Sequence, residues 1–275
     1  MNLEPLLHLL ADEPETPVDV TEINLLLSTD EYPNLDVHPL VERLDTYAAT
    51  LRPRLRGVHS LETKVLELCQ FLFGELGFTG NQEDYYDPRN SYMNEVMHRK
   101  LGIPITLSAL AISVGQRAGM NILGVALPGH FIARAQYEDE IIFFDPFNDG
   151  RILDITECEQ LIERITGKPF TVTQDTFQTA LPGEIVVRML NNLKGIYLEK
   201  GDFLRCGRVI ERLKILLPAD PHQKRDLGLC QVQLLRYGAA IDNLKQYLEL
   251  VPGASDAQAI SKILNQATSM VAKWN

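Results

Sequence analysis

The sequence has few cysteines, and none of them stands close to another. The four are Cys69, Cys158, Cys206 and Cys230, so the Cys-x-x-Cys spacing of zinc sites and redox motifs does not occur. The HExxH pattern of zinc proteases, the GxxxxGK[ST] pattern of P-loops and the GxGxxG pattern of dinucleotide-binding folds are also absent. We therefore expect free thiols, no bound metal and no cofactor.

The sequence also lacks a run of basic residues and a long apolar run. Acidic side chains outnumber basic ones by 37 to 26, which gives a formal net charge of −11. This charge repels phosphate backbones and anionic lipids, so we expect no nucleic-acid partner and no membrane association. The longest weakly polar stretch, residues 103–115, is too short to span a bilayer, and the N-terminus lacks the basic start of a signal peptide. These absences predict a cytoplasmic protein.

The apolar residues that are present suffice for a large core. Hydrophobic residues make up 45% of 275, which suits one large or two ordinary domains and excludes wholly disordered or collagen-like chains. In the first 80 residues, helical periodicity interrupted by prolines predicts several short helices. The clearest spans residues 60–76, with Ser60 and Thr63 as candidate caps and an apolar stripe that ends at Gly77.

In the central part, helical periodicity gives way to alternating strands. A short helix is expected over 92–100 with Ser91 as its cap, and a longer one over 106–118. Three segments have the alternation of β-strands: 121–127, 130–137 and 140–144. The turn Pro128–Gly129 between the first two favours an antiparallel meander packed on the longer helix.

The residues after 182 return to helical periodicity and repeat with a period of 34. The corresponding residues are Leu193 and Leu227, Cys206 and Ala240, and Pro218 and Pro252. This pattern resembles the tetratricopeptide repeat, although Lys194 and Gln231 depart from it. Two repeats leave an apolar end uncovered, so residues 255–272 are expected to form a capping helix.

Four blocks of the central part, taken in order, carry a resemblance to a known family. They are residues 85–96 (YYDPRNSYMNEV), 102–108 (GIPITLS), 127–131 (LPGHF) and 145–148 (DPFN). The sequence resembles the bacterial Sir-type "invasion regulator B" family, which joins a transglutaminase-like core to C-terminal tetratricopeptide repeats. The resemblance covers nearly the whole chain, from about residue 20 to 252.

The resemblance implies an α+β fold in three parts. Residues 1–80 would form a helical N-terminal region that packs on the core. Residues 81–181 would form a transglutaminase-like, papain-like core with an antiparallel sheet. Residues 182–275 would form an all-α module of two tetratricopeptide repeats and a capping helix.

The resemblance also implies a site in which Cys, His and Asp meet, with the cysteine at the start of the long helix. There the helix N-terminus lowers the pKa of the thiol, the imidazole takes its proton, and the carboxylate orients the imidazole. His130 and Asp145 match the last two members, and we expect them to be in contact as a residual catalytic dyad. No cysteine lies between Cys69 and Cys158, so thiol transglutaminase or protease activity is not expected.

Other polar residues of the four blocks are candidates for the same cleft. Thr106 and Ser108 offer hydroxyls in the first helical turn, where such hydroxyls also serve as ordinary caps. Asn90, Asn94 and Glu95 are candidate ligand-binding groups, and a capping interaction with Ser91 is the alternative for Glu95. His130 and Asp145 have a local alternative too, in which they only stabilise turns.

Three functions follow from these observations and stay open. The first is a cytoplasmic regulatory pseudoenzyme whose repeat module binds a protein or peptide partner. The second is a hydrolase or acyl/amide-processing enzyme that uses His130 and Asp145 with a Ser/Thr hydroxyl or water. The third is sensing of a small ligand in the cleft.

Overall fold

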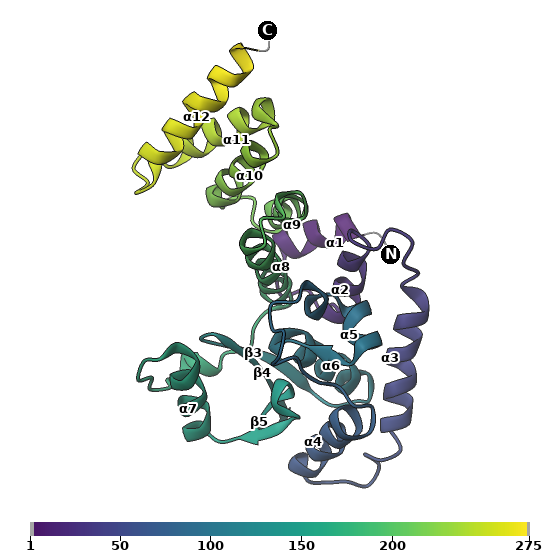
Figure 1. Cartoon of the computed structure of the whole chain (residues 1–275). Coiled ribbons are helices and arrows are strands. Elements are labelled where there is room, and N and C mark those ends of the chain that lie inside the picture. Colours follow the sequence, from purple (N-terminus) through teal and green to yellow (C-terminus); the bar gives the residue numbers. More distant parts are fainter. Residues whose placement is uncertain (1–2, 274–275) are drawn as a thin grey trace. The chain divides into compact units, whose positions relative to one another are not determined.

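The computed structural model describes residues 3–273, which form two compact units. One unit comprises Glu15–Met189, and the other combines the start of the chain, up to Pro14, with the residues from Leu190 onward. Helix α8, Pro182–Glu199, contains the boundary. The first unit mixes helices with antiparallel strands and the second is helical (Figure 1), which confirms the predicted fold class. The three-part division at residues 80 and 181 stays a prediction.

Three helices begin the Glu15–Met189 unit: α2 (Val20–Ser28), α3 (His38–Leu51) and α4 (Leu61–Cys69). Ser60 caps α4 as expected, because its Oγ accepts from the Thr63 N–H at 3.2 Å. The regular helix does not continue to residue 76. It changes to a π-helical segment, Gln70–Glu75, whose wider turn buries the three consecutive apolar side chains Phe71, Leu72 and Phe73.

The centre of this unit is helix α6 (Pro104–Arg117), whose side chains are all buried from Pro104 to Gly115. It begins two residues earlier than predicted, since proline suits the first helical position. The preceding helix α5 (Met93–Arg99) follows a 3₁₀ turn, Pro88–Ser91, and two short parallel strands, β1 (Thr79–Gly80) and β2 (Leu101–Gly102), pair beside them.

The predicted cap of α5 is wrong. The Met93 N–H donates to Asn24 Oδ1 of α2 at 2.7 Å, so a residue distant in sequence caps the helix. Ser91 Oγ is buried instead and has no hydrogen-bond partner within residues 3–273.

The predicted meander is confirmed. Strands β3 (Ile122–Leu127), β4 (His130–Tyr137), β5 (Glu140–Asp145) and β6 (Arg151–Leu153) pair antiparallel in that order. Gly129, with φ of 73°, takes the left-handed conformation that the β3–β4 turn requires. Strand β6 has no sequence signal, because three residues are too few for a visible alternation.

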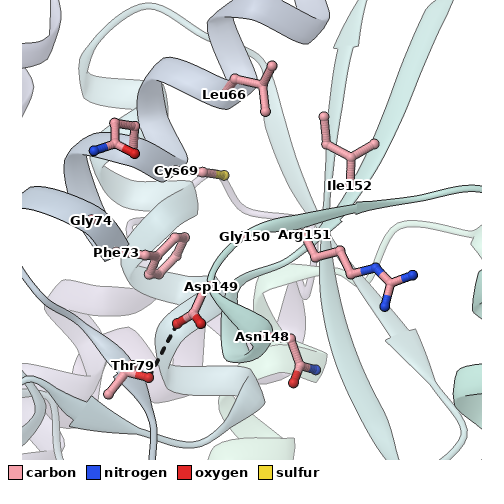
Figure 2. A pocket seen from close by; sticks show the side chains of 11 residues that line it. Leu66, Cys69, Phe73, Gly74, Thr79, Asn148, Asp149, Gly150, Arg151 and Ile152 are labelled. Atoms are coloured by element: carbon pink, nitrogen blue, oxygen red, sulfur yellow. Dashed lines mark hydrogen bonds between the residues drawn. The ribbon is translucent and has the colours of Figure 1, made fainter.

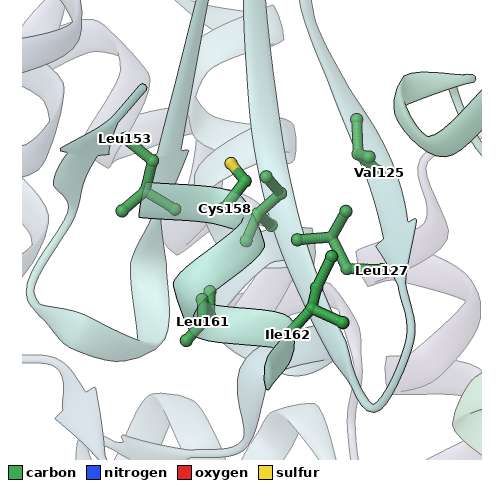
Figure 3. Packing of buried hydrophobic residues seen from close by; sticks show 7 residues of the cluster. Val125, Leu127, Leu153, Cys158, Leu161 and Ile162 are labelled. Atoms are coloured by element: carbon green, nitrogen blue, oxygen red, sulfur yellow. The ribbon is translucent and has the colours of Figure 1, made fainter. Parts of the chain in front are cut away.

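Helix α6 packs against β3 and β4, and helix α7 (Ile155–Thr166) supplies a second apolar layer. Figure 3 shows this layer, in which residues of α7 meet apolar side chains of the strands. Its buried members are Val125, Leu127, Ile132, Leu153, Cys158, Leu161 and Ile162. The sheet is therefore fixed firmly enough to hold side chains at its strand ends.

The second unit contains α1 (Leu3–Asp12), α9 (Phe203–Leu216), α10 (Pro221–Gln233), α11 (Tyr237–Leu250) and α12 (Ala257–Ala272). Cys206 and Ala240, the small residues of the repeat, are fully buried. Lys194, which departs from the repeat pattern, is buried because its ammonium pairs with Asp226 and donates to Gln223 Oε1 at 3.0 Å. Helix α12 matches the predicted capping helix over 255–272.

No helix in the described part of the chain is long and apolar enough to cross a membrane.

Candidate functional site

His130 and Asp145 are hydrogen bonded, as predicted. His130 is the first residue of β4 and Asp145 the last of β5, and neighbouring antiparallel strands bring them to one edge of the sheet. His130 Nε2 lies 2.9 Å from Asp145 Oδ2. Both side chains are nearly buried, with 5% and 1% of their surfaces exposed, so the low dielectric around them strengthens the contact.

The contact fixes the tautomer of the imidazole. An ionised carboxylate only accepts hydrogen bonds, so Nε2 of His130 carries the hydrogen and donates it to Asp145. In the neutral ring, Nδ1 then holds the free lone pair. Within residues 3–273, Nδ1 has no hydrogen-bond partner. The arrangement leaves His130 with the nitrogen of a general base or a hydrogen-bond acceptor.

Asp145 is itself held in place by the turn that follows it. The side-chain amide of Asn148 donates to Oδ2 at 2.7 Å, and the Phe147 N–H donates to Oδ1 at 3.0 Å. The local turn interpretation of Asp145 is thus also correct, and it does not exclude the contact with His130. The sequence analysis did not single out Asn148, although it stands in the DPFN block.

One aromatic ring contacts the imidazole, a second ring contacts the first, and a cation is bonded to the backbone of His130. The ring of Phe147 stands edge-on to His130, with centroids 6.0 Å apart, and Tyr85 stands edge-on to Phe147 at 5.9 Å. Arg188 of α8 donates from Nη2 to the carbonyls of His130 at 2.7 Å and Leu127 at 3.3 Å. Burial lowers the pKa of Arg188 and raises the pKa of Tyr85. Arg188 carried no sequence signal, because it lies on a helix that the periodicity assigned to the repeats.

The two candidate hydroxyls of α6 are both buried and bonded to backbone. Thr106 Oγ1 donates to the Asn90 carbonyl at 2.9 Å and accepts from the Ile103 N–H at 3.0 Å. Ser108 Oγ donates to the Phe131 carbonyl at 3.2 Å. Within the described residues neither hydroxyl is bonded to His130, and each donates to a backbone carbonyl outside α6.

The three amide and carboxylate candidates have different surroundings. Asn90 organises the loop before α5: its amide donates to the Asp84 and Tyr85 carbonyls at 2.8 and 3.2 Å, and its Oδ1 accepts from Asn81. It therefore holds in place the loop that carries Tyr85. Asn94 Oδ1 is buried and unpartnered within residues 3–273, and Glu95 is half-buried near Arg89. Neither Asn94 nor Glu95 contacts the dyad among the described side chains.

None of the four cysteines belongs to helix α6. All four are buried and free. Burial raises the pKa of Cys69 and of Cys158 to about 12, so both thiols are protonated at neutral pH. The first turn of α6 consists of buried Pro104, Ile105 and Thr106, without a thiol.

A pocket of about 810 Å³ opens beside the loop after Asp145 (Figure 2). Asn148, which bonds Asp145, is part of its wall, and the opposite wall contains Cys69 and Phe73. Gly150 approaches Cys69 so closely that an added Cβ would lie 2.4 Å from its Sγ. In residues 3–273 no group of His, Cys, Asp and Glu side chains has the arrangement of a metal site.

Comparison with protein families agrees with this geometry. Residues 38–191 match the model of the transglutaminase-like superfamily, and residues 193–265 match that of the tetratricopeptide repeat. A UPF0162 protein of Xylella fastidiosa is 34% identical over 261 residues, which cover 94% of this chain and 93% of the relative. The chain belongs to the UPF0162 family of transglutaminase-like proteins.

Other relatives share part of the chain. The UPF0162 protein of Pasteurella multocida is 28% identical over 70% of this chain and 74% of its own. F-box only protein 21 of Homo sapiens is 31% identical over 63% of this chain, which corresponds to 28% of that longer protein. No solved structure matches. The two family models support the transglutaminase-like and repeat assignment, while the Sir-type name stays a prediction.

Proposed function

We propose that this UPF0162 protein is a regulatory interaction protein, in which a transglutaminase-like core without its thiol nucleophile is joined to a partner-binding repeat module. The observation that carries the proposal is the first turn of α6, where Pro104, Ile105 and Thr106 stand in place of a cysteine. A His–Asp pair without a nucleophile retains only general-base assistance, roughly 10²- to 10⁴-fold where all else is aligned.

The repeat module supports binding of a protein or peptide. Tetratricopeptide repeats present extended surfaces to which peptides and helices bind. The module of this chain exposes large apolar side chains, including Leu198, Leu235 and Leu250, at 43%, 60% and 61% of their surfaces. The net charge of −11 favours a partner segment with basic residues, and the Sir-type resemblance suggests a regulatory role in the cytoplasm.

In F-box only protein 21 the matching region is 28% of a much longer chain, so a core of this type also occurs together with other segments.

Site-specific photo-crosslinking in living cells tests the proposal. A photoreactive amino acid is placed at Leu198, Leu235 or Leu250 of the full chain. The matched controls carry it at Ile141 or Tyr137, which are exposed on the transglutaminase-like core. The proposal predicts the same discrete partner at one or more module positions and not at the controls. Equal or absent crosslinking at all five positions would contradict it.

A hydrolase or acyl/amide-processing enzyme is the second candidate, and one observation favours it. The 2.9 Å contact between His130 and Asp145 leaves Nδ1 of the imidazole as the free base. Such an enzyme would use a bound water or a hydroxyl released from its present contacts. Covalent labelling that depends on His130 distinguishes this candidate from the first.

A further inference from the structure

A second pocket, of about 340 Å³, lies at the end of β4 that is opposite to His130. Its walls come from the end of α3, the loop to α4, α4 itself, the loop between α6 and β3, and the last two residues of β4. All of these segments belong to the Glu15–Met189 unit. The volume is within the range of small-molecule sites, and the walls include neither member of the dyad.

Three cationic side chains line this pocket, Arg52, Arg56 and Lys64, and the described lining residues include no carboxylate. We call it the basic pocket. Arg52 is fixed by a hydrogen bond from Nη2 to the Arg117 carbonyl at 2.8 Å, and the Lys64 ammonium lies 5.2 Å from the centre of the Tyr137 ring. The guanidinium of Arg56 has no partner among the described residues. None of the three cations is therefore paired with an acidic side chain of the described chain.

Unpaired cations at this place contrast with the rest of the chain, in which acidic residues outnumber basic ones by 37 to 26. Arg54, which stands between Arg52 and Arg56 in the sequence, forms two hydrogen bonds with Glu75. Arg117, whose carbonyl holds Arg52, pairs through its own guanidinium with three carboxylates. Three cations that share one pocket repel one another, so an anion bound among them would lower their electrostatic free energy.

We propose that the basic pocket binds the phosphate group of a small phosphomonoester. Guanidinium forks and a lysine ammonium are the side chains that bind phosphate oxygens, and three positive charges suit a dianion better than a single carboxylate. The half-buried Leu55 and the buried Leu61 and Met120 also line the pocket, and they provide apolar surface for the organic group of the ester. This inference goes beyond the proposed function, because it involves neither the repeat module nor the dyad.

Titration of the full chain with three anions tests the proposal. Phenyl phosphate is compared with phenyl sulfate, which has a similar shape but one negative charge, and with inorganic phosphate, which lacks the organic group. Binding is followed by calorimetry and ligand-observed NMR at about pH 8, where a phosphate carries two charges. We expect phenyl phosphate to bind several-fold more tightly than either comparison compound. Equal affinity for phenyl phosphate and either of the other two, or no binding at millimolar concentrations, would overturn the proposal.

Variants assign the binding to the basic pocket. Arg56→Gln and Lys64→Gln should each weaken phenyl phosphate binding several-fold, and the double variant roughly 10-fold or more. The control is the double variant Arg43→Gln with Lys168→Gln, because both side chains are exposed and lie outside the pocket. It changes the net charge by the same amount. If Lys64→Gln lowers the melting temperature, Arg56→Gln decides, since its guanidinium has no partner to lose among the described residues. Equal losses of affinity in the two double variants, or unchanged binding in Arg56→Gln, would overturn the proposal.

Discussion

His130 Nε2 and Asp145 Oδ2 lie 2.9 Å apart at one edge of the sheet, in a core whose central helix begins without a cysteine. The orienting half of a catalytic set is thus present, together with a tautomer that leaves Nδ1 free. Under the proposed function, the nucleophile is the missing part. Because both residues are nearly buried and Asp145 also accepts hydrogen bonds from the turn that follows it, their contact also contributes to the stability of the core.

That contribution can be measured at Asp145. Asp145→Ala removes the acceptor of three donors, from His130, Phe147 and Asn148, and leaves them unsatisfied. We expect the free energy of unfolding to fall by about 3 kcal/mol in urea titrations followed by circular dichroism. The exposed Asp139, in the β4–β5 turn, is the control, and Asp139→Ala should change stability little. Equal losses in both variants would show that the dyad adds no stability.

The close packing in the pocket wall leads to a second prediction, on the stability of a Gly150 variant. Its φ of 74° is left-handed, and a Cβ there would lie 2.4 Å from Cys69 Sγ and 2.6 Å from Cys69 Cβ. Gly167 has nearly the same φ, 69°, with nothing within 4 Å of an added Cβ. Gly167→Ala should cost about 1 kcal/mol from backbone strain alone. Gly150→Ala should cost about 2 kcal/mol more, because α4 and the loop must separate. Similar losses would contradict the close packing of Cys69 on Gly150.

Cys69 itself should react slowly with thiol reagents. Burial raises its pKa to about 12, so roughly one thiol in 10⁴ is ionised at pH 8. Leu66, half exposed on the same pocket wall, provides the comparison. In the folded Leu66→Cys variant, iodoacetamide should alkylate the introduced thiol rapidly. The four original thiols should react only after unfolding. Rapid alkylation of Cys69 in the folded parent chain would refute its burial.

The same pKa shift predicts how stability depends on pH. The folded pKa of Cys69 is raised above the unfolded value, so the neutral buried thiol stabilises the fold fully below about pH 8.5. This contribution is lost as the pH rises toward 12. From pH 8 to pH 11, the free energy of unfolding should therefore fall more steeply in the parent chain than in Cys69→Ala. Parallel curves would contradict the shift.

In the repeat module, Lys194 should be a stabilising residue rather than a defect. Its ammonium pairs with Asp226 and Gln223 in a nearly buried position. Lys194→Ala should lower the free energy of unfolding by about 2 kcal/mol, because a partly buried carboxylate loses its partner. Lys200→Ala, on an exposed position of the same chain segment, should leave thermal and urea unfolding almost unchanged. A neutral effect of Lys194→Ala would show that Arg225 alone compensates Asp226.

Most of the fold could be predicted from the sequence, because the periodicity and turn residues of each segment agree with the element that it forms. Strands β3, β4 and β5, the turn at Gly129 and the capping helix α12 all had local signals. The errors arose where distant residues decide the structure. Asn24 caps α5 from another helix, and the π-helical turn after Cys69 depends on burying Phe71 and Phe73 together.

The residues of the candidate site also differ in whether a local sequence signal or tertiary packing places them. His130 and Asp145 stand at strand ends, so the sequence and the resemblance sufficed to predict their contact. Arg188 reaches the backbone of His130 from a helix that carries no motif, and only the packing of α8 on the β3–β4 turn reveals this contact. Thr106 and Ser108 looked like possible nucleophiles in sequence, whereas the structure gives both hydroxyls backbone partners.

Covalent labelling tests most directly whether the core has lost its nucleophile. The full chain and His130→Ala are incubated with a fluorophosphonate probe and with iodoacetamide at neutral pH, and adducts are located by peptide mass spectrometry. We predict no adduct that depends on His130, since the first turn of α6 has no thiol and the hydroxyls of Thr106 and Ser108 are bonded to backbone. An adduct on Thr106, Ser108 or Cys69 that forms in the parent chain and disappears in His130→Ala would contradict this account and establish the enzyme.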